Sequence, residues 1–204
     1  MARDTQSIVK MSRREGYALH PKAHKVLAKR SNAPGASPSG RFRGKASQYS
    51  LQLREKQKVK RLYGLLEKQF SRLMKEASAS RGQSGKVLLK LLEQRADNAI
   101  YRAGFAPSRR AARQLVTHGH FTINGRRFDV PSLRVKPGDE LIVREGSQKS
   151  EYFKRLDDVS PAGDSVGWQT VDRKKFSVKI TGEPAREEAE PDINEQLIVE
   201  YYSR

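Results

Sequence analysis

The feature that most constrains this 204-residue chain is an excess of positive charge concentrated in its first 145 residues. Lys and Arg number 41 against 23 Asp and Glu, which gives a net charge of +18 at pH 7. Residues 1–145 carry +21 of that charge, and residues 146–204 carry −3. Because repulsion on this scale opposes a compact chain unless a partner screens it, we expect the partner to be a polyanion. A merely solvated surface needs a net charge of only about 2–8 in a small domain, so nucleic acid is the favoured partner.

Composition limits the class of protein further. Hydrophobic residues make up 36% of the chain and charged residues 31%, which allows a core of modest size. Cys is absent, so neither disulfides nor a cysteine zinc site can supplement that core. No apolar run approaches the roughly 18 residues of a membrane span, and the first residues lack the apolar stretch of a secretory signal. The chain is therefore expected to be soluble and intracellular, with no membrane partner.

The first 50 residues show little hydrophobic periodicity, and positions 31–40 are rich in turn formers. We expect residues 1–50 to form a basic, loop-rich N-terminal extension without a fixed hydrophobic core, which orders best against a partner. One short helix is compatible with residues 21–30.

A helical domain is predicted to follow this extension. Between residues 51 and 79, apolar side chains recur at steps of three and four, the spacing of one helix face. Ser50 is the expected N-cap, and Gly64 is expected to divide the region into two helices. We assign residues 51–92 to this domain and expect residues 146–204 to complete it.

Residues 93–145 are expected to form a compact module. One helix, capped by Ser84, is expected to run into the module and end at Gly104, and the next should begin after the capping residue Ser108. The apolar period then changes to two, and Asn124-Gly125 predicts a hairpin with a type I′ turn. The predicted fold class is α+β, a mainly helical first domain with an inserted module of two helices packed on a small antiparallel sheet.

The last segment is only partly predictable. Residues 146–185 give short strand-like runs, among which Trp168 is expected to be buried. Asp192 and Glu195 have the spacing of a capping box, and the apolar residues after them fit one helix face. We therefore expect a C-terminal helix.

The second helix of the module carries a cluster of positive charge at its start. Arg109, Arg110 and Arg113 lie in its first turn and a half, where free backbone N–H groups and the helix dipole also favour anions. Guanidinium groups at that position form a site for phosphate oxygens, although the alternative is that they merely solvate the helix. More basic residues follow at the helix exit and in the hairpin: His118, His120, Arg126 and Arg127. The pattern favours recognition of the shape and backbone of folded RNA rather than reading of bases.

The same residues carry a resemblance to a known family. Residues 91–127 read L-L-E-Q-R-A-D-N-A-I-Y-R-A-G-F-A-P-S-R-R-A-A-R-Q-L-V-T-H-G-H-F-T-I-N-G-R-R and resemble the RNA-binding module named after bacterial small-subunit ribosomal protein S4. That module also occurs in tyrosyl-tRNA synthetases, pseudouridine synthases and small heat-shock RNA binders. Resemblance to the ribosomal protein family itself extends over the chain, through M-A-R at the start, R-R-E-G at 13–16, Y-S-L-Q-L-R-E-K-Q-K-V-K-R-L-Y-G-L-L-E-K-Q-F at 49–70 and I-N-E-Q-L-I-V-E-Y-Y-S-R at 193–204.

The resemblance implies a primary rRNA-binding protein of the small ribosomal subunit, cytoplasmic and ribosome-bound. Family members bind 16S rRNA, nucleate assembly of the subunit body, contribute to translational accuracy and border the channel through which mRNA enters. They contact the fifth small-subunit ribosomal protein through their C-terminal part. On this chain, the resemblance places that partner interface at Asn194, Glu195, Gln196, Tyr201 and Tyr202.

The resemblance also extends the expected RNA-binding residues beyond the module. Arg41, Arg43 and Lys45 stand where the family has a basic run, and they are the candidates for contact with mRNA or nearby rRNA. Basic residues of the other matched segments complete the set: Arg13, Arg14, Arg54, Lys56, Lys60 and Arg61.

The chain departs from many relatives at its N-terminus. Those relatives have a four-cysteine zinc knuckle, whereas Val9 and Ser12 stand here where its first pair would lie. We expect the cysteine-free, zinc-less form of the family, with no metal and no cofactor, held at its N-terminus by packing and RNA.

Two other functions compete with this one. Arg155-Leu156-Asp157 resembles the signature of pseudouridine synthases, but only 47 residues follow Asp157, too few for the catalytic sheet of a synthase. No set of nucleophile, base and orienting residue can be assembled, so catalytic residues are expected to be absent. The third possibility is a stand-alone stress factor that binds stalled subunits.

Overall fold

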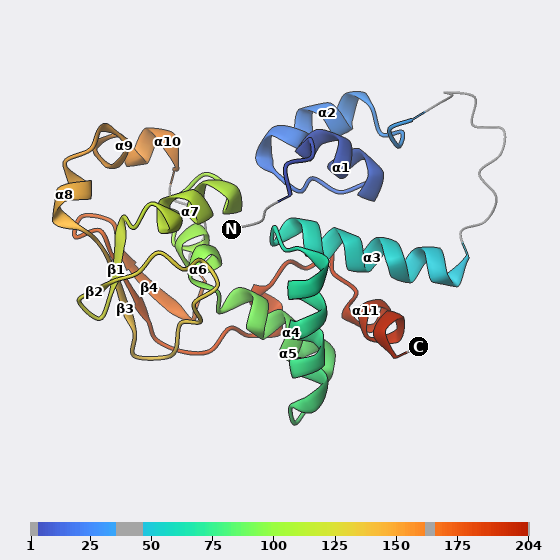
Figure 1. The fold of residues 1–204 in the computed structure, drawn as a ribbon. Coiled ribbons are helices and arrows are strands. Elements are labelled where there is room, and N and C mark those ends of the chain that lie inside the picture. Colours follow the sequence, from blue (N-terminus) through green and yellow to red (C-terminus); the bar gives the residue numbers. More distant parts are fainter. Residues whose placement is uncertain (1–3, 36–46, 162–165, 204) are drawn as a thin grey trace. The chain divides into compact units, whose positions relative to one another are not determined.

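The computed structural model describes residues 4–35, 47–161 and 166–203 (Figure 1). The chain divides into two compact units. The first unit comprises Met1–Leu88 with Asp192–Arg204, and the second comprises Leu89–Pro191. The first is helical and the second combines helices with a sheet, so the chain is α+β as predicted.

The first unit begins with a small helical element. It consists of α1 (Ile8–Glu15), the 3₁₀ turn η1 (Pro21–Ala23) and α2 (His24–Lys29). Gly16 ends α1 at φ 65°, and the chain then folds back so that the Leu19 N–H donates to Ser12 Oγ at 3.3 Å. Met11, Leu19 and Ala23 are buried. The expectation that this region lacks a fixed hydrophobic core is therefore wrong for the described residues 4–35, because a few apolar side chains suffice once the turn brings them together.

Two longer helices form the body of the first unit. These are α3 (Gln48–Leu62) and α4 (Glu67–Ala79), separated as predicted at Gly64, which adopts φ 66°. The N-cap of α3 is Ser47 rather than Ser50, because the Ser47 hydroxyl accepts the Ser50 N–H at 3.3 Å. Their buried faces supply a core that includes Val59, Leu62, Phe70 and Met74.

The C-terminal helix α11 (Glu195–Tyr202) completes the first unit by packing against α3 (Figure 1). Its N-cap is Asn194, whose side-chain oxygen accepts the N–H groups of Gln196 and Leu197. The capping box predicted from Asp192 is therefore not the start of this helix. Ile193 and Ile198 are buried, in agreement with the predicted apolar face.

Helix α5 (Ser84–Glu93) leads from the first unit into the second, where α6 (Ala96–Arg102) and α7 (Arg109–Thr117) follow. The sequence predicted one helix up to Gly104, but Arg95 adopts an extended conformation that pairs with Arg134 and separates α5 from α6. Gly104, at φ 73°, follows the end of α6.

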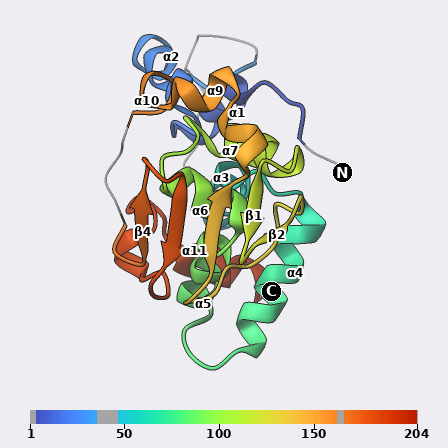
Figure 2. The ribbon, with the colours of Figure 1, turned by 90° about the vertical axis from the view of Figure 1, so that its left-hand side faces the viewer.

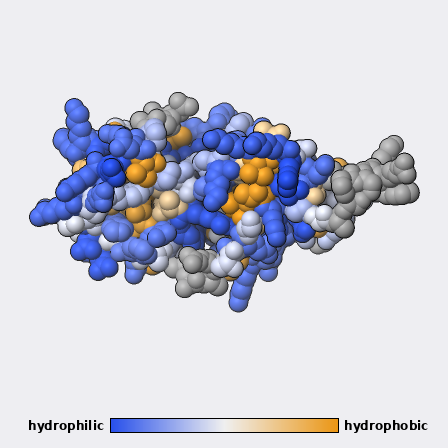
Figure 3. Space-filling view, turned by 90° about the horizontal axis from the view of Figure 1, so that it is seen from above, coloured by the Kyte–Doolittle hydropathy of each residue, from blue (hydrophilic) through white to orange (hydrophobic). Residues whose placement is uncertain are grey.

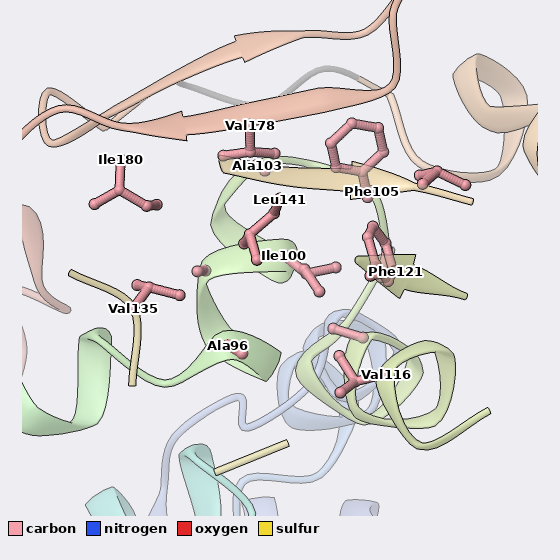
Figure 4. Close-up of a cluster of buried hydrophobic side chains, with 14 of the residues drawn as sticks. Ala96, Ile100, Ala103, Phe105, Val116, Phe121, Val135, Leu141, Val178 and Ile180 are labelled. Atoms are coloured by element: carbon pink, nitrogen blue, oxygen red, sulfur yellow. The ribbon is translucent and has the colours of Figure 1, made fainter. Parts of the chain in front are cut away.

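The sheet of the second unit has five antiparallel strands in the order β2-β1-β3-β5-β4 (Figure 2). They are β1 (Phe121–Ile123), β2 (Arg126–Arg127), β3 (Glu140–Val143), β4 (Gln169–Asp172) and β5 (Ser177–Ile180). Asn124 and Gly125 both have positive φ, 48° and 80°, as the predicted type I′ turn requires. α6 and α7 cover one face of the sheet, and their side chains meet Phe121, Leu141 and Val178 in one core (Figure 4).

Four short helical segments complete the second unit: α8 (Glu145–Gln148), α9 (Glu151–Lys154), α10 (Leu156–Val159) and η2 (Arg186–Glu188). Phe153 and Leu156 join the core, and so does Trp168, as predicted. The segment up to Pro191 thus packs with the module, whereas the sequence assigned residues 146–204 to the helical domain. The physical reason is the pairing of β5 with β3, which buries Val178 and Ile180 beneath the helices.

Among the described residues, no helix has both the length and the apolar character needed to cross a membrane.

Candidate nucleic-acid-binding surface

The start of α7 is built as predicted, but its arginines do not face the same way. The Ser108 hydroxyl caps the helix by accepting the Ala111 N–H at 3.2 Å. Arg110 is exposed. Arg109 instead turns inward: its Nε donates to Asn98 Oδ1 at 2.9 Å, and its Nη2 lies 2.9 Å from Glu190 Oε1. The structure therefore does not bring the three arginines into one open cluster.

A buried polar network explains this arrangement. Glu93, whose residue exposure is only 1%, accepts two hydrogen bonds from Arg102 at 2.9 and 3.0 Å and one from Asn98 at 2.7 Å. A second buried carboxylate, Asp97, binds Arg95 at 2.8 Å and Arg113 at 3.3 Å. Because a buried charge needs a partner, these carboxylates hold the arginines toward the protein.

The residues of this network are largely those of the motif L-L-E-Q-R-A-D-N at 91–98 and of the α7 arginines. Glu93 and Asp97 in that motif could have indicated that the arginines are paired, since an acid buried next to the basic start of a helix needs a cation. Glu190 gave no such signal, because it lies 81 residues from Arg109 along the chain. Contact of Arg109 and Arg113 with RNA stays a prediction.

The other end of α7 presents cations openly. We call the exposed residues His118, Arg126, Arg127 and Arg144 the hairpin surface. A Cβ at Gly119, which has φ 70°, would lie 2.7 Å from Arg127 Nε, so the absence of a side chain there makes room for that guanidinium. Arg144, which the sequence pattern did not single out, donates from Nη1 to the Gly119 carbonyl at 3.2 Å. The guanidinium groups of Arg127 and Arg144 thus lie beside the end of one helix.

His120 lies beside the hairpin surface and is partly buried. Its Nδ1 is 3.0 Å from Ser147 Oγ, and its ring is 6.0 Å from that of His118. Burial, with smaller contributions from His118 and Arg144, lowers the pKa of His120 below its ordinary 6.5. The same surroundings favour the neutral form of the ring, and a neutral imidazole attracts phosphate less than a charged one.

In the first unit, the predicted RNA-binding cations of α3 are paired with carboxylates. Arg54 and Arg61 both bind Glu15, and Lys56 and Lys60 both bind Glu67, at 2.8 and 3.0 Å. Burial opposes the ionised form of Glu67, but hydrogen bonds from Lys56, Lys60 and Tyr202 outweigh it and lower its pKa to about 2.

The remaining predicted cations differ in their surroundings. Arg14 is exposed, whereas Arg13 donates from Nε to the Asn32 carbonyl at 3.0 Å. Arg41, Arg43 and Lys45 lie outside the described residues. The face seen in Figure 3 is mostly hydrophilic, with apolar side chains gathered in a few separate patches.

The predicted partner residues on α11 are mostly packed within the first unit. The Tyr202 hydroxyl donates to Glu67 Oε1 at 2.8 Å, and the Tyr201 ring lies 4.7 Å from Lys56 Nζ. The stem of Glu195 lies against Gly85. Asn194 and Gln196 are exposed.

An apolar surface next to α11 was not predicted. Tyr49 and Leu51, at the start of α3, are 49% and 45% exposed, and the Tyr49 ring is 5.9 Å from that of Tyr201. Apolar side chains on an amphipathic helix are normally expected to be buried, so the sequence alone did not predict their exposure.

No group of three or more His, Asp or Glu side chains is arranged to hold a metal ion in the part of the chain that the structure describes. The Asp157 side chain is 91% exposed and lies 3.4 Å from Arg173 Nε. A carboxylate so open to water is not held in a catalytic pocket.

Comparison with known proteins gives matches over most of the chain. Residues 3–93 match the family described as ribosomal protein S4/S9 N-terminal domain, and residues 94–141 match the S4 domain. The chain is 48% identical over 204 residues to small ribosomal subunit protein uS4 of Chlorobaculum tepidum, with all of both chains covered. The proteins of the same name from Chlorobaculum parvum and Herpetosiphon aurantiacus are 48% identical over 206 residues and 47% identical over 215, again with full coverage.

Proposed function

Because the chain belongs to the family of small ribosomal subunit protein uS4, we propose that it is a primary rRNA-binding protein that nucleates assembly of the subunit body and contributes to translational accuracy. The family is structural and non-enzymatic, which removes the RNA-modifying alternative. The protein is a constituent of the small ribosomal subunit that binds 16S rRNA, and it acts in the cytoplasm as part of the ribosome.

The hairpin surface is the observation in this structure that best supports RNA binding by the second unit. Its guanidinium groups are exposed, whereas six of the other predicted RNA-binding cations that the structure describes are paired with carboxylates. Guanidinium groups recognise phosphate through paired N–H donors, without reading bases. The proposed mechanism is neutralisation of several phosphates at once, which fixes the angles between RNA helices.

Binding of the full chain to a 16S rRNA fragment over a range of salt concentrations tests this mechanism. If on the order of ten phosphates are neutralised, log affinity falls with log salt at a slope of roughly −7 to −9. A slope near −1, or equal affinity for random duplex DNA, would refute it. Retention of one copy per small subunit through a high-salt wash separates a structural constituent from a substoichiometric stress factor.

The proposed protein partner is the fifth small-subunit ribosomal protein. Exposed Tyr49 and Leu51 beside α11 support an apolar contact there, with Asn194 and Gln196 as polar neighbours. Exposed aromatic and aliphatic side chains of this kind are typical anchors of a protein interface. Proximity of mRNA to Arg41, Arg43 and Lys45 stays part of the proposal.

A further inference from the structure

The N-terminal element, residues 4–35, carries an unusual balance of charge. It contains seven cations and two acids. The cations are Lys10, Arg13, Arg14, Lys22, Lys25, Lys29 and Arg30. All but Arg13 are exposed. Of the two acids, Asp4 lies at the start of the element, where it accepts the Gln6 N–H, and Glu15 ends α1.

Glu15 is removed from the surface by its contacts with α3. Its side chain is fully buried, and Oε1 accepts hydrogen bonds from Arg54, at 3.1 Å, and from Arg61. Arg54 and Arg61 are seven residues apart, which places them about two turns apart on one face of α3. One carboxylate thus bridges two points on the helix against which α1 packs.

This contact joins two sequence segments that are otherwise distant. R-R-E-G at 13–16 lies in α1 and its cap, and L-R-E-K-Q-K-V-K-R at 53–61 lies in α3. The chain has no Cys, so no cysteine zinc site can perform the same attachment. The element also meets α3 where Lys58 Nζ lies 5.4 Å from the Tyr17 ring centroid, and its buried apolar residues are few: Met11, Leu19 and Ala23.

The cost of burying the Glu15 carboxylate, set against its pairing with Arg54 and Arg61, indicates the role of this contact. Burial raises the pKa of Glu15, against the opposing influence of Arg54, Arg61 and Arg14, so removing this carboxylate from water is unfavourable. A buried ion pair of this kind adds little net stability compared with apolar packing, and its clearest known use is to fix one arrangement among several. The expected contribution of Glu15 is therefore geometric.

We propose that Glu15 is a positioning residue, which docks the N-terminal element on α3 through Arg54 and Arg61 so that the six exposed cations of the element form one ordered surface for rRNA phosphates. The inference rests on the proposed function, because it takes rRNA as the ligand. Arg54 and Arg61 act in it as attachment points rather than as phosphate contacts.

The test compares Glu15→Gln with Glu151→Gln in the full chain. Both changes raise the net charge by one, but Glu151 lies in an exposed i,i+4 pair with Arg155, in the second unit. If charge alone mattered, both variants would bind a 16S rRNA fragment slightly more tightly. If Glu15 positions the element, Glu15→Gln should instead weaken binding, by at least about tenfold at 0.15 M salt. The salt slope should become shallower by roughly 2 or more, because the cations of a detached element no longer contribute together.

A second readout does not involve RNA. Hydrogen exchange of the free protein should show lost protection of the α1 amides in Glu15→Gln and in the double variant R54Q/R61Q, with α4 and the second unit unchanged. Glu151→Gln should keep protection throughout. Binding by Glu15→Gln as tight as that of Glu151→Gln, or unchanged protection of α1, would overturn the inference. If the wild type itself fails to prefer rRNA to duplex DNA, the proposed function fails, while hydrogen exchange still decides whether Glu15 holds the element in place.

Discussion

Replacing Gly85 by Ala should destabilise the first unit, although Ala is normally the better helix residue. Gly85 lies in α5 at an ordinary negative φ, so its backbone would accept a side chain. A Cβ there would be 2.7 Å from Glu195 Cγ and 2.8 Å from Glu195 Cβ. Carbon atoms pack at about 3.5–4.0 Å, so α5 and α11 would have to separate by roughly 1 Å.

Two opposing effects determine how much Gly85→Ala changes the free energy of unfolding. Ala exceeds Gly in helix propensity by at most about 1 kcal/mol. Overpacking of a close contact costs typically about 1–3 kcal/mol, and here the obstruction includes a Cβ, which cannot rotate away. Subtracting the propensity gain from the cost of overpacking leaves a net loss of up to about 2 kcal/mol in the free energy of unfolding of the first unit.

Urea denaturation followed by far-ultraviolet circular dichroism measures this loss. The single tryptophan, Trp168, lies in the second unit, so its fluorescence reports that unit separately. Gly146→Ala is the matched control, because Gly146 lies in α8 with no atom within 4 Å of the new Cβ. It should be neutral or slightly stabilising. Equal stability of the two variants would show that α11 shifts freely, and the reasoning from the close approach would be refuted.

Three further predictions concern RNA binding, pH and metal. Changing Arg126 and Arg127 together to Ala should make the salt slope of rRNA binding shallower by roughly 1.4–1.8, because each phosphate that is no longer neutralised contributes about 0.7–0.9. An unchanged slope would show that the hairpin surface does not bind phosphates. Glu67 has a folded-state pKa of about 2, below its ordinary 4.5, so its stabilisation is present above pH 4.5 and is lost as the pH falls toward 2. Because this carboxylate is 47% exposed, the effect should not exceed about 1 kcal/mol; Glu67→Gln should flatten the acid limb of a melting-temperature profile, and an equally steep limb would contradict the assignment. Treatment with EDTA should leave the melting temperature unchanged, since the chain has no Cys for a zinc knuckle; a drop on chelation, reversed by zinc, would argue against a metal-free N-terminus.

Local features of the fold were predictable because their causes lie within a few residues. The break at Gly64, the cap at Ser108 and the turn at Asn124-Gly125 each depend on a backbone conformation or a hydrogen bond that neighbouring residues determine. The α+β class followed from the change of apolar period. No long-range information was needed for any of these features.

The pairing of charges could not be predicted in the same way. Arg109 was correctly placed at the start of a helix, yet its main partner, Glu190, comes from the far end of the second unit. Likewise, the sequence of β5 indicates a strand, but its residues do not predict that it pairs with β3. Which cations stay open to a ligand therefore depends on contacts between distant segments, and these appear only in the folded chain.

The division of the first unit between the two ends of the chain has a consequence for its biosynthesis. Synthesis proceeds from the N-terminus, and domains generally fold as units while the chain emerges. The second unit is continuous from Leu89 to Pro191, so its described strands are available before α11 is made. The first unit must wait for α11, which follows the second unit in the chain, before Phe70 and Tyr202 can meet. Helix α3, which is made before the second unit, thus meets its neighbour α11 only after that unit has been made.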